Sequence, residues 1–229
     1  MIVLGILGTG IAARTAMHTA THSLQLAHPG TDDEGFQVVF VSQKPGTSTL
    51  GGHDIMSAAE FCALEAETKY FNPAIADSRH RKQAATLMLH QGVSPLSLSD
   101  PSTLILPDVT MEPGWLLPYL NTLNSNVRIG KYFHAGVSTT VSHHNEIGDY
   151  VTFGHRVACS GNAIIEDHVT ICTGAMVMQG KPDKPTRIGE GAVIHANAIV
   201  IGDVVPGAHM AGNPAKPVDP IQLFGGEPW

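Results

Sequence analysis

Two adjacent histidines, His143 and His144, are the side chains of this sequence best suited to moving a proton. An imidazole titrates close to neutral pH and can accept a proton from a reacting amine or hydroxyl. His143 comes two residues after the apolar Val141, where we expect its side chain to point away from the core. Gly161 follows eighteen residues later, and we expect its missing side chain to leave room beside the imidazole for a thin ligand. The alternative is an ordinary surface histidine.

A glycine-rich segment near the N-terminus is suited to holding phosphate. Gly8 and Gly10 follow a strand-like segment and precede a helix-like one, so backbone amides can face an anion at the helix start. NAD would also fit, but its sites carry an acidic residue at the end of the second strand, where this chain has residues 41–43 (VSQ). A nucleotide-linked sugar therefore fits better. Asp77 and Arg81, at the next strand-to-helix turn, are either further sugar-nucleotide contacts or a helix cap and a surface charge.

Apolar residues recur at every sixth position over much of the chain, although only 43% of all residues are apolar. A period of six fits neither a helix nor an alternating strand. It predicts a solenoid of short parallel strands, three per turn, with residues 18 apart stacked on one another. This is the hexapeptide repeat of the left-handed β-helix. Small residues such as Gly130 and Gly136, directly after the apolar anchors, are expected to let the corners turn. The anchors are Ile105, Met111, Leu117, Leu123, Ile129, Ala135, Val141, Ile147, Phe153, Cys159, Ile165, Ile171 and Val177.

The six-residue period is interrupted once. After Val177 the next anchor is Ile188, eleven residues further on, so five extra residues lie within residues 180–186. Two prolines and three charged residues in this segment predict a loop that projects from a corner. It is either a solvated bulge or the lip of a binding cleft, with Lys181 and Lys184 near anionic groups of a ligand.

The first hundred residues do not follow the six-residue period. Strand-like and helix-like segments alternate there, which predicts an α/β, Rossmann-like domain with a small parallel sheet. We therefore expect a domain at 1–99, a left-handed parallel β-helix at 100–215 and a Pro/Gly-rich tail at 216–229. The expected strands are 1–7, 36–42 and 70–76, and the expected helices run to about residue 26 and over 57–67 and 78–91.

Composition excludes several partner classes. The formal net charge is −7 and there is no basic run, which argues against nucleic acid as a partner. The apolar stretches are shorter than a membrane span, and the apolar N-terminus lacks the basic region of a signal peptide. Three cysteines, Cys62, Cys159 and Cys172, are expected to be reduced core residues. These features favour a cytoplasmic protein.

Five motifs, in order over nearly the whole chain, point to a known family. They are residues 8–14 (GTGIAAR), 74–81 (AIADSRHR), 100–102 (DPS), 142–149 (SHHNEIGD) and 211–216 (AGNPAK). With the hexapeptide ladder, they resemble the bacterial sugar acyltransferases that include sialic acid O-acetyltransferases and UDP-4-amino-sugar N-acetyltransferases. The resemblance implies a homotrimer with acetyl-CoA bound between neighbouring β-helices. It also implies that the N-terminal domain holds the nucleotide of a sugar substrate.

The same resemblance implies an activity. We expect an acetyl-CoA-dependent acyltransferase that N-acetylates a nucleotide-linked amino sugar for surface-glycan biosynthesis. O-acetylation of a sialic acid or of another sugar hydroxyl is the alternative. The resemblance places the catalytic base at His143. In the family an acidic residue often follows the base, and here His144 stands in its place. Either Glu146, two residues further on, supplies the carboxylate, or His144 takes a different role in the site.

The resemblance also implies contacts for both substrates. A family histidine near the acetyl group aligns with Thr152, whose hydroxyl can donate one hydrogen bond to the thioester carbonyl. Family positions that line the pantetheine arm map onto Gly161, Thr173 and Ala196. The N-terminal fingerprint adds Ile11 and Ala12 to the glycines as sugar-nucleotide contacts.

Two other classes of protein remain as alternatives. A γ-type carbonic anhydrase is also a histidine-rich left-handed β-helix trimer, and its zinc needs three imidazoles, two of them close in sequence. The thirteen histidines here show no convincing set with that spacing, and we predict no metal site. A non-catalytic binding trimer that kept the fold is the other alternative, and His144 in place of the acid is the feature that favours it.

Overall fold

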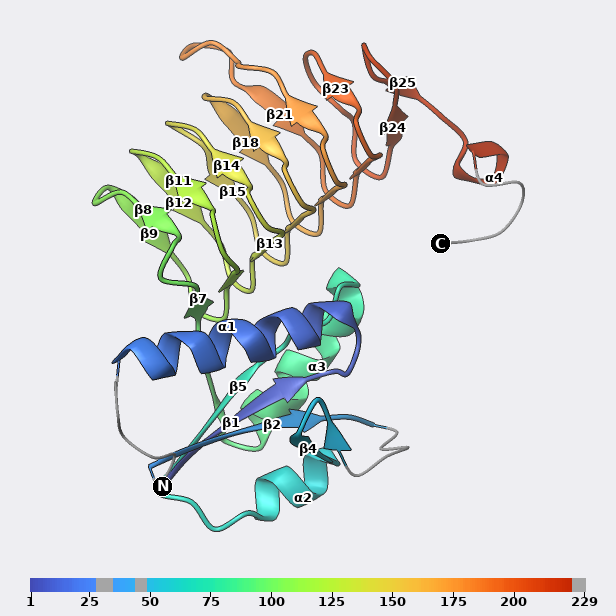
Figure 1. The fold of residues 1–229 in the computed structure, drawn as a ribbon. Coiled ribbons are helices and arrows are strands. Elements are labelled where there is room, and N and C mark those ends of the chain that lie inside the picture. Colours follow the sequence, from blue (N-terminus) through green and yellow to red (C-terminus); the bar gives the residue numbers. More distant parts are fainter. Residues whose placement is uncertain (28–34, 44–48, 224–229) are drawn as a thin grey trace. The chain divides into compact units, whose positions relative to one another are not determined.

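The computed structural model describes residues 1–27, 35–43 and 49–223. The chain forms two compact units, both drawn in Figure 1. The first unit comprises Met1–Pro101 and Pro113–Tyr119, and the second comprises Ser102–Glu112 and Leu120–Trp229.

A mainly parallel sheet with the strand order β3-β4-β2-β1-β5-β6 organises the first unit. Strand β1 pairs in parallel with both β2 and β5, and only β3 runs antiparallel to its neighbour β4. The elements of this unit are β1 (Ile2–Leu7), α1 (Ile11–Ala27), β2 (Phe36–Val41), β3 (Thr49–Leu50), β4 (His53–Met56), α2 (Ala58–Ala63), β5 (Thr68–Asn72), α3 (Ser78–His90), β6 (Ser94–Pro95), β7 (Leu98–Ser99) and β10 (Leu116–Leu117).

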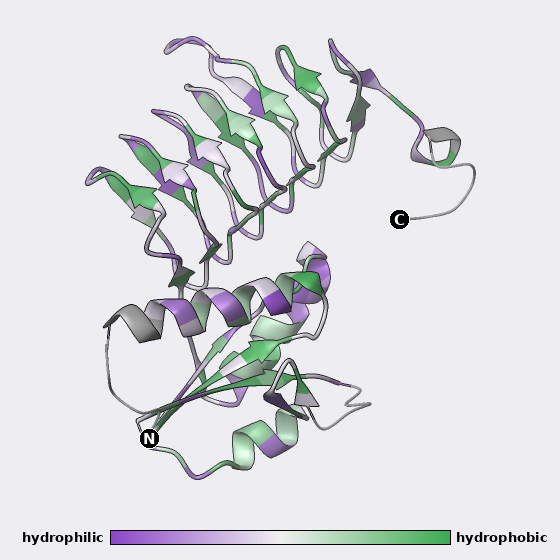
Figure 2. Ribbon diagram, in the orientation of Figure 1, coloured by the Kyte–Doolittle hydropathy of each residue, from purple (hydrophilic) through white to green (hydrophobic). Residues whose placement is uncertain are grey.

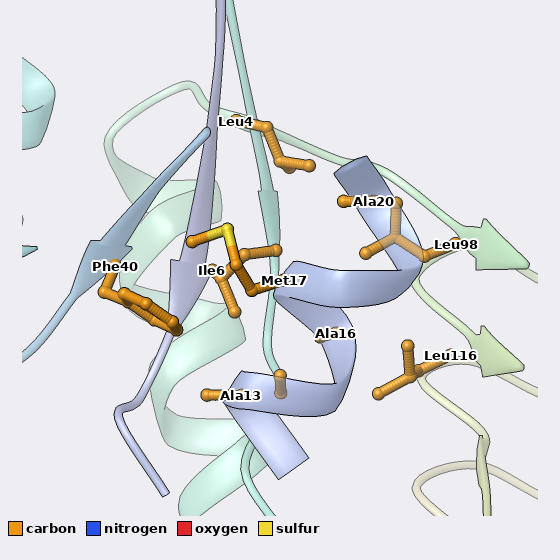
Figure 3. Close-up of a cluster of buried hydrophobic side chains, with 10 residues drawn as sticks. Leu4, Ile6, Ala13, Ala16, Met17, Ala20, Phe40, Leu98 and Leu116 are labelled. Carbon is orange, nitrogen blue, oxygen red and sulfur yellow. The ribbon is translucent and has the colours of Figure 1, made fainter. Parts of the chain in front are cut away.

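Helix α1 packs on this sheet with small residues (Figure 3). Ala13, Ala16 and Ala20 face the strands and let the helix approach side chains such as Leu4 and Ile6 closely. All members of this cluster are buried, as expected for a parallel strand covered on both faces. The other labelled members are Met17, Phe40, Leu98 and Leu116.

Two expected elements have different limits in the structure. The strand expected at 70–76 is β5, which ends at Asn72 because Pro73 has no N–H for the ladder. The helix expected at 57–67 is the shorter α2. It begins with a capping box in which Ser57 and Glu60 exchange side-chain and backbone hydrogen bonds. The backbone N–H of Ser57, followed by its hydroxyl, lowers the pKa of Glu60.

The second unit is a parallel β-helix built from three sheets of very short strands. The register confirms the predicted stacking: Leu123 lies beside Val141, Val141 beside Cys159, and Cys159 beside Val177. Figure 2 shows the hydrophobic residues recurring from coil to coil. The strands are β8 (Leu104–Ile105), β9 (Val109–Met111), β11 (Thr122–Leu123), β12 (Val127–Ile129), β13 (His134–Ala135), β14 (Thr140–Val141), β15 (Glu146–Ile147), β16 (Thr152–Phe153), β17 (Ala158–Cys159), β18 (Ala163–Ile165), β19 (Thr170–Ile171), β20 (Met176–Val177), β21 (Thr186–Ile188), β22 (Val193–Ile194), β23 (Ile199–Val200), β24 (His209–Ala211) and β25 (Lys216–Pro217), and a short helix, α4 (Pro220–Leu223), follows them.

The inward anchors form the core of this unit. Leu123, Val141 and Val177 are fully buried, and so is Cys159, whose thiol pKa is raised by burial to about 12. Ile105 is an exception at 37% exposure, because its strand β8 is the last in its sheet. The three cysteines are free thiols, but only Cys159 is buried, while Cys62 and Cys172 are half-buried, so the expected core position holds for Cys159 alone. None of the described helices is long and apolar enough to span a membrane.

The corners of the β-helix turn through residues with left-handed backbone angles. From Leu120 onward such a residue recurs at every sixth position as far as His168, with φ between 54° and 61°. The glycines that follow the anchors have another role. A Cβ on Gly136 would lie 2.4 Å from the backbone nitrogen of His155 in the next coil, so these glycines permit close stacking of the coils.

The five extra residues form a short, closed excursion. Between β18 and β21 the register step is 23 residues, because Ile165 pairs with Ile188. Lys181 and Lys184 join their backbones by two hydrogen bonds of 3.0 and 3.1 Å, so the excursion is a tight turn. Both lysine side chains are exposed.

Candidate functional site

His143 and His144 form the corner that follows β14, and their backbone is held by the coils on both sides. The N–H of His144 donates to the carbonyl of Ser125 at 3.2 Å, and the N–H of Asn162 donates to the carbonyl of His143 at 3.2 Å. His144 occupies the left-handed corner position, with φ 56°. The buried Asn145 completes the corner by donating to the carbonyl of Ser142 at 2.8 Å. The backbone beneath both imidazoles is therefore fixed.

The two imidazoles contact each other. Their Nδ1 atoms are 3.0 Å apart, and the rings meet edge to face with centroids 5.2 Å apart. Two nitrogens at this distance share one proton, so one imidazole donates and the other accepts. Both side chains are exposed, which leaves the rest of each ring accessible to a ligand.

Gly161 forms the seat of the His143 ring. A Cβ added to Gly161 would lie 2.5 Å from Cε1 of His143 and 2.8 Å from both ring nitrogens. The structure therefore corrects the expectation of an open space above Gly161, because the imidazole itself fills it. The glycine is required by this close approach and not by its backbone angles, since φ is outside the left-handed region.

Side chains at the equivalent position of other corners are used differently. Asp149 and Asp167 each accept the backbone N–H of the residue eighteen positions earlier, at 2.8 Å. His155 does the same through Nδ1, accepting from Val137 at 3.0 Å. These three side chains stitch one coil to the previous one. His143 instead lies against the following coil and directs its Nδ1 to His144, so its ring is not used to hold the solenoid together.

The carboxylate of Glu146 is engaged with a residue outside the histidine pair. It accepts from the guanidinium of Arg128 at 3.2 Å on the outer face of β12 and β15. Glu146 lines an open groove of about 720 Å³ along that sheet, together with Glu166 and residues of β18. Glu166 in turn forms an ion pair with Arg187. The structure thus gives Glu146 an ion pair with Arg128, and His144 is the residue that bonds to Nδ1 of His143.

The other residues expected to line acetyl-CoA belong to a different corner of the β-helix. Thr173 follows β19 and Ala196 follows β22. Thr173 is stacked on His155, which lies eighteen residues earlier at the same corner of the preceding coil. Thr152 lies on β16 of the same sheet, in register with His134 as expected. Within one chain, this corner and the corner of His143 and Gly161 are separate.

A second histidine pair lies beside Ala196. Nε2 of the buried His195 is 3.1 Å from Nδ1 of His209 on β24. Desolvation, with a smaller contribution from His209, lowers the pKa of His195, which favours its neutral form. Within the described ranges, no three His, Cys, Asp or Glu side chains are grouped so as to hold a metal ion.

The first unit contains its own pocket of about 400 Å³ at the carboxyl ends of β1 and β2. Gly8 and Thr9 line it after β1, and Ser42 and Gln43 line it after β2. The neighbours of β1 are β2 on one side and β5 on the other, so the chain reverses direction across the sheet here. In open parallel sheets, ligands bind at such a reversal.

The N-terminus of α1 opens beside this pocket. Gly8 has φ +107°, and a Cβ there would come within 3.4 Å of the carbonyl of Ala74. Gly10 begins the helix by accepting from the N–H of Arg14, and a Cβ on it would meet nothing within 4 Å. The first turn, with Ile11 and Ala12, contains no acidic residue. Its free N–H groups and the helix dipole therefore favour an anion.

Asp77 and Arg81 have structural roles. Asp77 caps α3 by accepting the N–H of His80 at 2.7 Å. Arg81 is fully buried, and its guanidinium donates to the carbonyls of Ile75 and Ala76 at 2.8 and 3.1 Å. It holds the turn after β5 from inside, so Arg81 is not the surface charge of one alternative, and its guanidinium contacts the backbone in place of the ligand of the other.

Models of protein families give no match. A GDP-perosamine N-acetyltransferase of Escherichia coli O157:H7 is 32% identical over 216 residues, covering 94% of this chain and 96% of that protein.

This chain belongs to the bacterial sugar acetyltransferase family.

Solved structures agree with that membership. WeeI from Acinetobacter baumannii AYE is 35% identical, with a TM-score of 0.88 over 95% of this chain and 100% of that one. PerB from Caulobacter crescentus, solved in complex with CoA and GDP-perosamine, has a TM-score of 0.81 over 94% of this chain and 97% of that one. Its identity is 20%, so it supports the fold. The family resemblance inferred from the sequence motifs is confirmed.

In this family member the pocket of the first unit is lined by residues that the motifs did not single out. Gln83 and Leu87 of α3 face it together with His80, which belongs to the motif 74–81 but was given no role there. Helical spacing could have found them, because positions three or four apart share one face of a helix. Counting from His80 selects that face and excludes Arg81, which points inward.

The close contact between Gly161 and the His143 ring can be tested by substitution. Gly161→Ala puts a methyl group where the His143 ring lies, so the ring must leave its position while the backbone can stay. We expect the melting temperature to remain close to that of the wild type and the acetyl-transfer rate to fall by roughly tenfold or more. Activity assays and thermal denaturation measure the two effects.

A double-mutant cycle provides the control. In a His143→Ala background the ring is absent, and Gly161→Ala should then cause no further loss of activity. An additional loss in that background would show that Gly161 acts on something other than His143.

Proposed function

We propose that this protein transfers the acetyl group of acetyl-CoA to the amino group of a nucleotide-linked sugar. It is an acetyltransferase, and acetyl-CoA is its co-substrate. The observation that carries this assignment is the 32% identity to a GDP-perosamine N-acetyltransferase over nearly the whole length of both chains. The names of the relatives favour an amine over a hydroxyl as the acceptor.

The exposed imidazole of His143 supplies the base for this reaction. The amine attacks the thioester carbon, the new C–N bond forms, and the C–S bond breaks. Nε2 of His143 takes the proton that leaves the nitrogen, and that proton can pass to the sulfur of the departing thiolate. No covalent enzyme intermediate is needed, because a thioester is already activated toward an amine.

The N-terminal segment 1–99 serves, in this proposal, as a Rossmann-like domain that holds the nucleotide. The pocket at the ends of β1 and β2 supports this, because the lining residues within the described part of the chain include no Asp, Glu, Lys or Arg. Phosphate would be held by the backbone at the start of α1, near Gly8, Gly10, Ile11 and Ala12. Ser42 and Gln43 stand where an NAD site would carry an acid. The segment 100–215 would be the acetyl-transfer domain.

The acetyl-CoA cleft, we propose, is shared between two copies of the chain in a homotrimer. His143 and Gly161 lie at one corner of the β-helix, while Thr152, Thr173 and Ala196 belong to another sheet and corner. Both corners can contact the same ligand if one corner comes from one chain and the other corner comes from a neighbouring chain. Cyclic symmetry repeats that contact and closes the ring.

Two further properties belong to the proposal. The six-residue period supports a left-handed winding of the β-helix. The free cysteines and the use of acetyl-CoA support a location in the cytoplasm, where thiols stay reduced.

The first test is a thiol-release assay with acetyl-CoA and a panel of nucleoside-diphosphate sugars, with His143→Ala alongside. The wild type should release thiol with amino sugars, and His143→Ala should lower turnover by roughly 10²–10⁴-fold with little change in acetyl-CoA affinity. Reaction with hydroxyl-bearing sugars alone would identify an O-acetyltransferase. A His143→Ala variant with wild-type turnover would refute the base assignment.

Gly10→Val tests the division between the two substrates. The added side chain meets open space, so folding should be unaffected. It would, however, stand where phosphate approaches the helix start, and we expect a strong rise in the acceptor KM with acetyl-CoA binding intact. Calorimetry with acetyl-CoA serves as the check, and loss of donor binding would contradict the assignment.

Light scattering tests the shared cleft. We expect the mass of three chains at micromolar concentration. A monomer that retained full acetyl-CoA affinity would show that one chain completes the cleft by itself.

A further inference from the structure

The partner of the base is itself an imidazole. Nδ1 of His143 faces Nδ1 of His144 at 3.0 Å, and the ring stands edge to face with it. Two features hold this contact in place. Gly161 seats the His143 ring from the following coil, and the left-handed corner at His144 aims the second ring back at the first.

Resting on the acetyltransferase function proposed above, we propose that His144 is a positioning residue that accepts the Nδ1–H of His143, so that the two imidazoles bind the reaction proton as one coupled pair. With Nδ1 of His143 donating, its Nε2 keeps a lone pair and can receive a proton from the amine. The reverse arrangement would leave a hydrogen on Nε2 and remove the base.

His155 shows how easily the other tautomer arises in this fold. At the equivalent hexad position its Nδ1 accepts the N–H of Val137, so its hydrogen is on Nε2. The seat on Gly161 keeps His143 from that arrangement, because the ring lies against the following coil. His144 then offers Nδ1 the acceptor that it needs.

The proton balance follows from this pairing. The amine loses one proton to Nε2 of His143 while the C–N bond forms. His143 is then an imidazolium whose Nδ1–H donates a charge-assisted hydrogen bond to the neutral His144. When the C–S bond breaks, the proton on Nε2 passes to the thiolate sulfur, and the pair returns to its starting state.

The surroundings of the pair contain few charges. The preceding coil presents Ser125 and Asn126, and the following coil presents Gly161 and Asn162. The charged side chains on adjoining segments are Glu146, which pairs with Arg128, and Lys181, Asp183 and Lys184 of the excursion after Gly180. The partner of the base is thus an imidazole and not a carboxylate, and an aspartate put in its place would add a negative charge beside the base.

Three substitutions at His144 test whether this residue acts as the hydrogen-bond acceptor of His143. Asn and Gly both tolerate a left-handed backbone, and the equivalent corners already carry Asn126 and Asn162. His144→Asn keeps an acceptor for Nδ1–H, His144→Gly removes it, and His144→Asp adds a negative charge. The readouts are kcat and KM as functions of pH, and ¹⁵N–¹H spectra of the histidine rings in the protein without substrates.

We expect His144→Gly to lower kcat on the order of tenfold with an unchanged acetyl-CoA KM, and His144→Asn to restore kcat to within about threefold of the wild type. His144→Asp should move the acid limb of the pH–rate profile upward by about one unit. The spectra should show hydrogen on Nδ1 of His143, and the two rings should titrate interdependently. In His144→Asn, His143 should titrate in a single step.

A His143 ring with its hydrogen on Nε2 in the free protein would overturn the proposal. Full activity of His144→Gly with an unchanged pH profile would also overturn it. The spectra do not depend on catalysis, so the two proposals can fail separately. Paired rings in a wild-type protein that acetylates no amino sugar would refute the proposed function, while the proton sharing itself would stand.

Discussion

The stacking of parallel coils at a fixed register is the constraint on which the second unit depends. Before the excursion each anchor side chain lies on the anchor eighteen residues away, as with Val141 and Cys159, and across the excursion the step is 23 residues. The backbones of successive coils are hydrogen-bonded. The apolar ladder supplies most of the stabilising burial, and the register transmits position along the solenoid. A side chain at one corner therefore has a predictable neighbour in the next coil. The meeting of His143 and Gly161 is a direct consequence.

The corners turn this regular scaffold into a site. Left-handed backbone is unfavourable for most side chains by about 1–2 kcal/mol, and here it recurs at every corner from Leu120 to His168. One column of corners carries Asn126, His144 and Asn162. Another carries Tyr132, Tyr150 and His168 as a stack of rings with centroids 5.1 and 5.2 Å apart. The same backbone thus presents a stack of packed rings at one edge and an exposed pair of imidazoles at another.

In the first unit the pocket is formed by the loops that follow parallel strands. Parallel strands end at one edge of the sheet, and the loops after β1 and β2 open there beside the start of α1. Arg81 holds the turn after β5 from within, which leaves the outer face of α3 to His80 and Gln83. The pocket is consequently lined by apolar side chains together with hydroxyl, amide and imidazole groups. The resulting chemistry suits a ligand that brings its own charge to the amides of a helix start.

The sequence by itself determined the architecture of the β-helix, the break in its period, the stacking step of eighteen residues and the family. The first three follow from periodicity, because a repeat of six has few structural solutions and its register is found by counting, whereas the family follows from five motifs placed on that repeat. The sequence also singled out His143 and Gly161, since their spacing is one full coil. Only the tertiary structure decided what occupies the space between them. Ring orientation depends on contacts across coils, and so the imidazole covers Gly161, while Glu146 pairs with Arg128 and His144 with His143. Arg81 shows the same limit of sequence analysis. An arginine in a turn motif gives the same sequence pattern whether its guanidinium contacts a ligand or, as here, the carbonyls of its own loop.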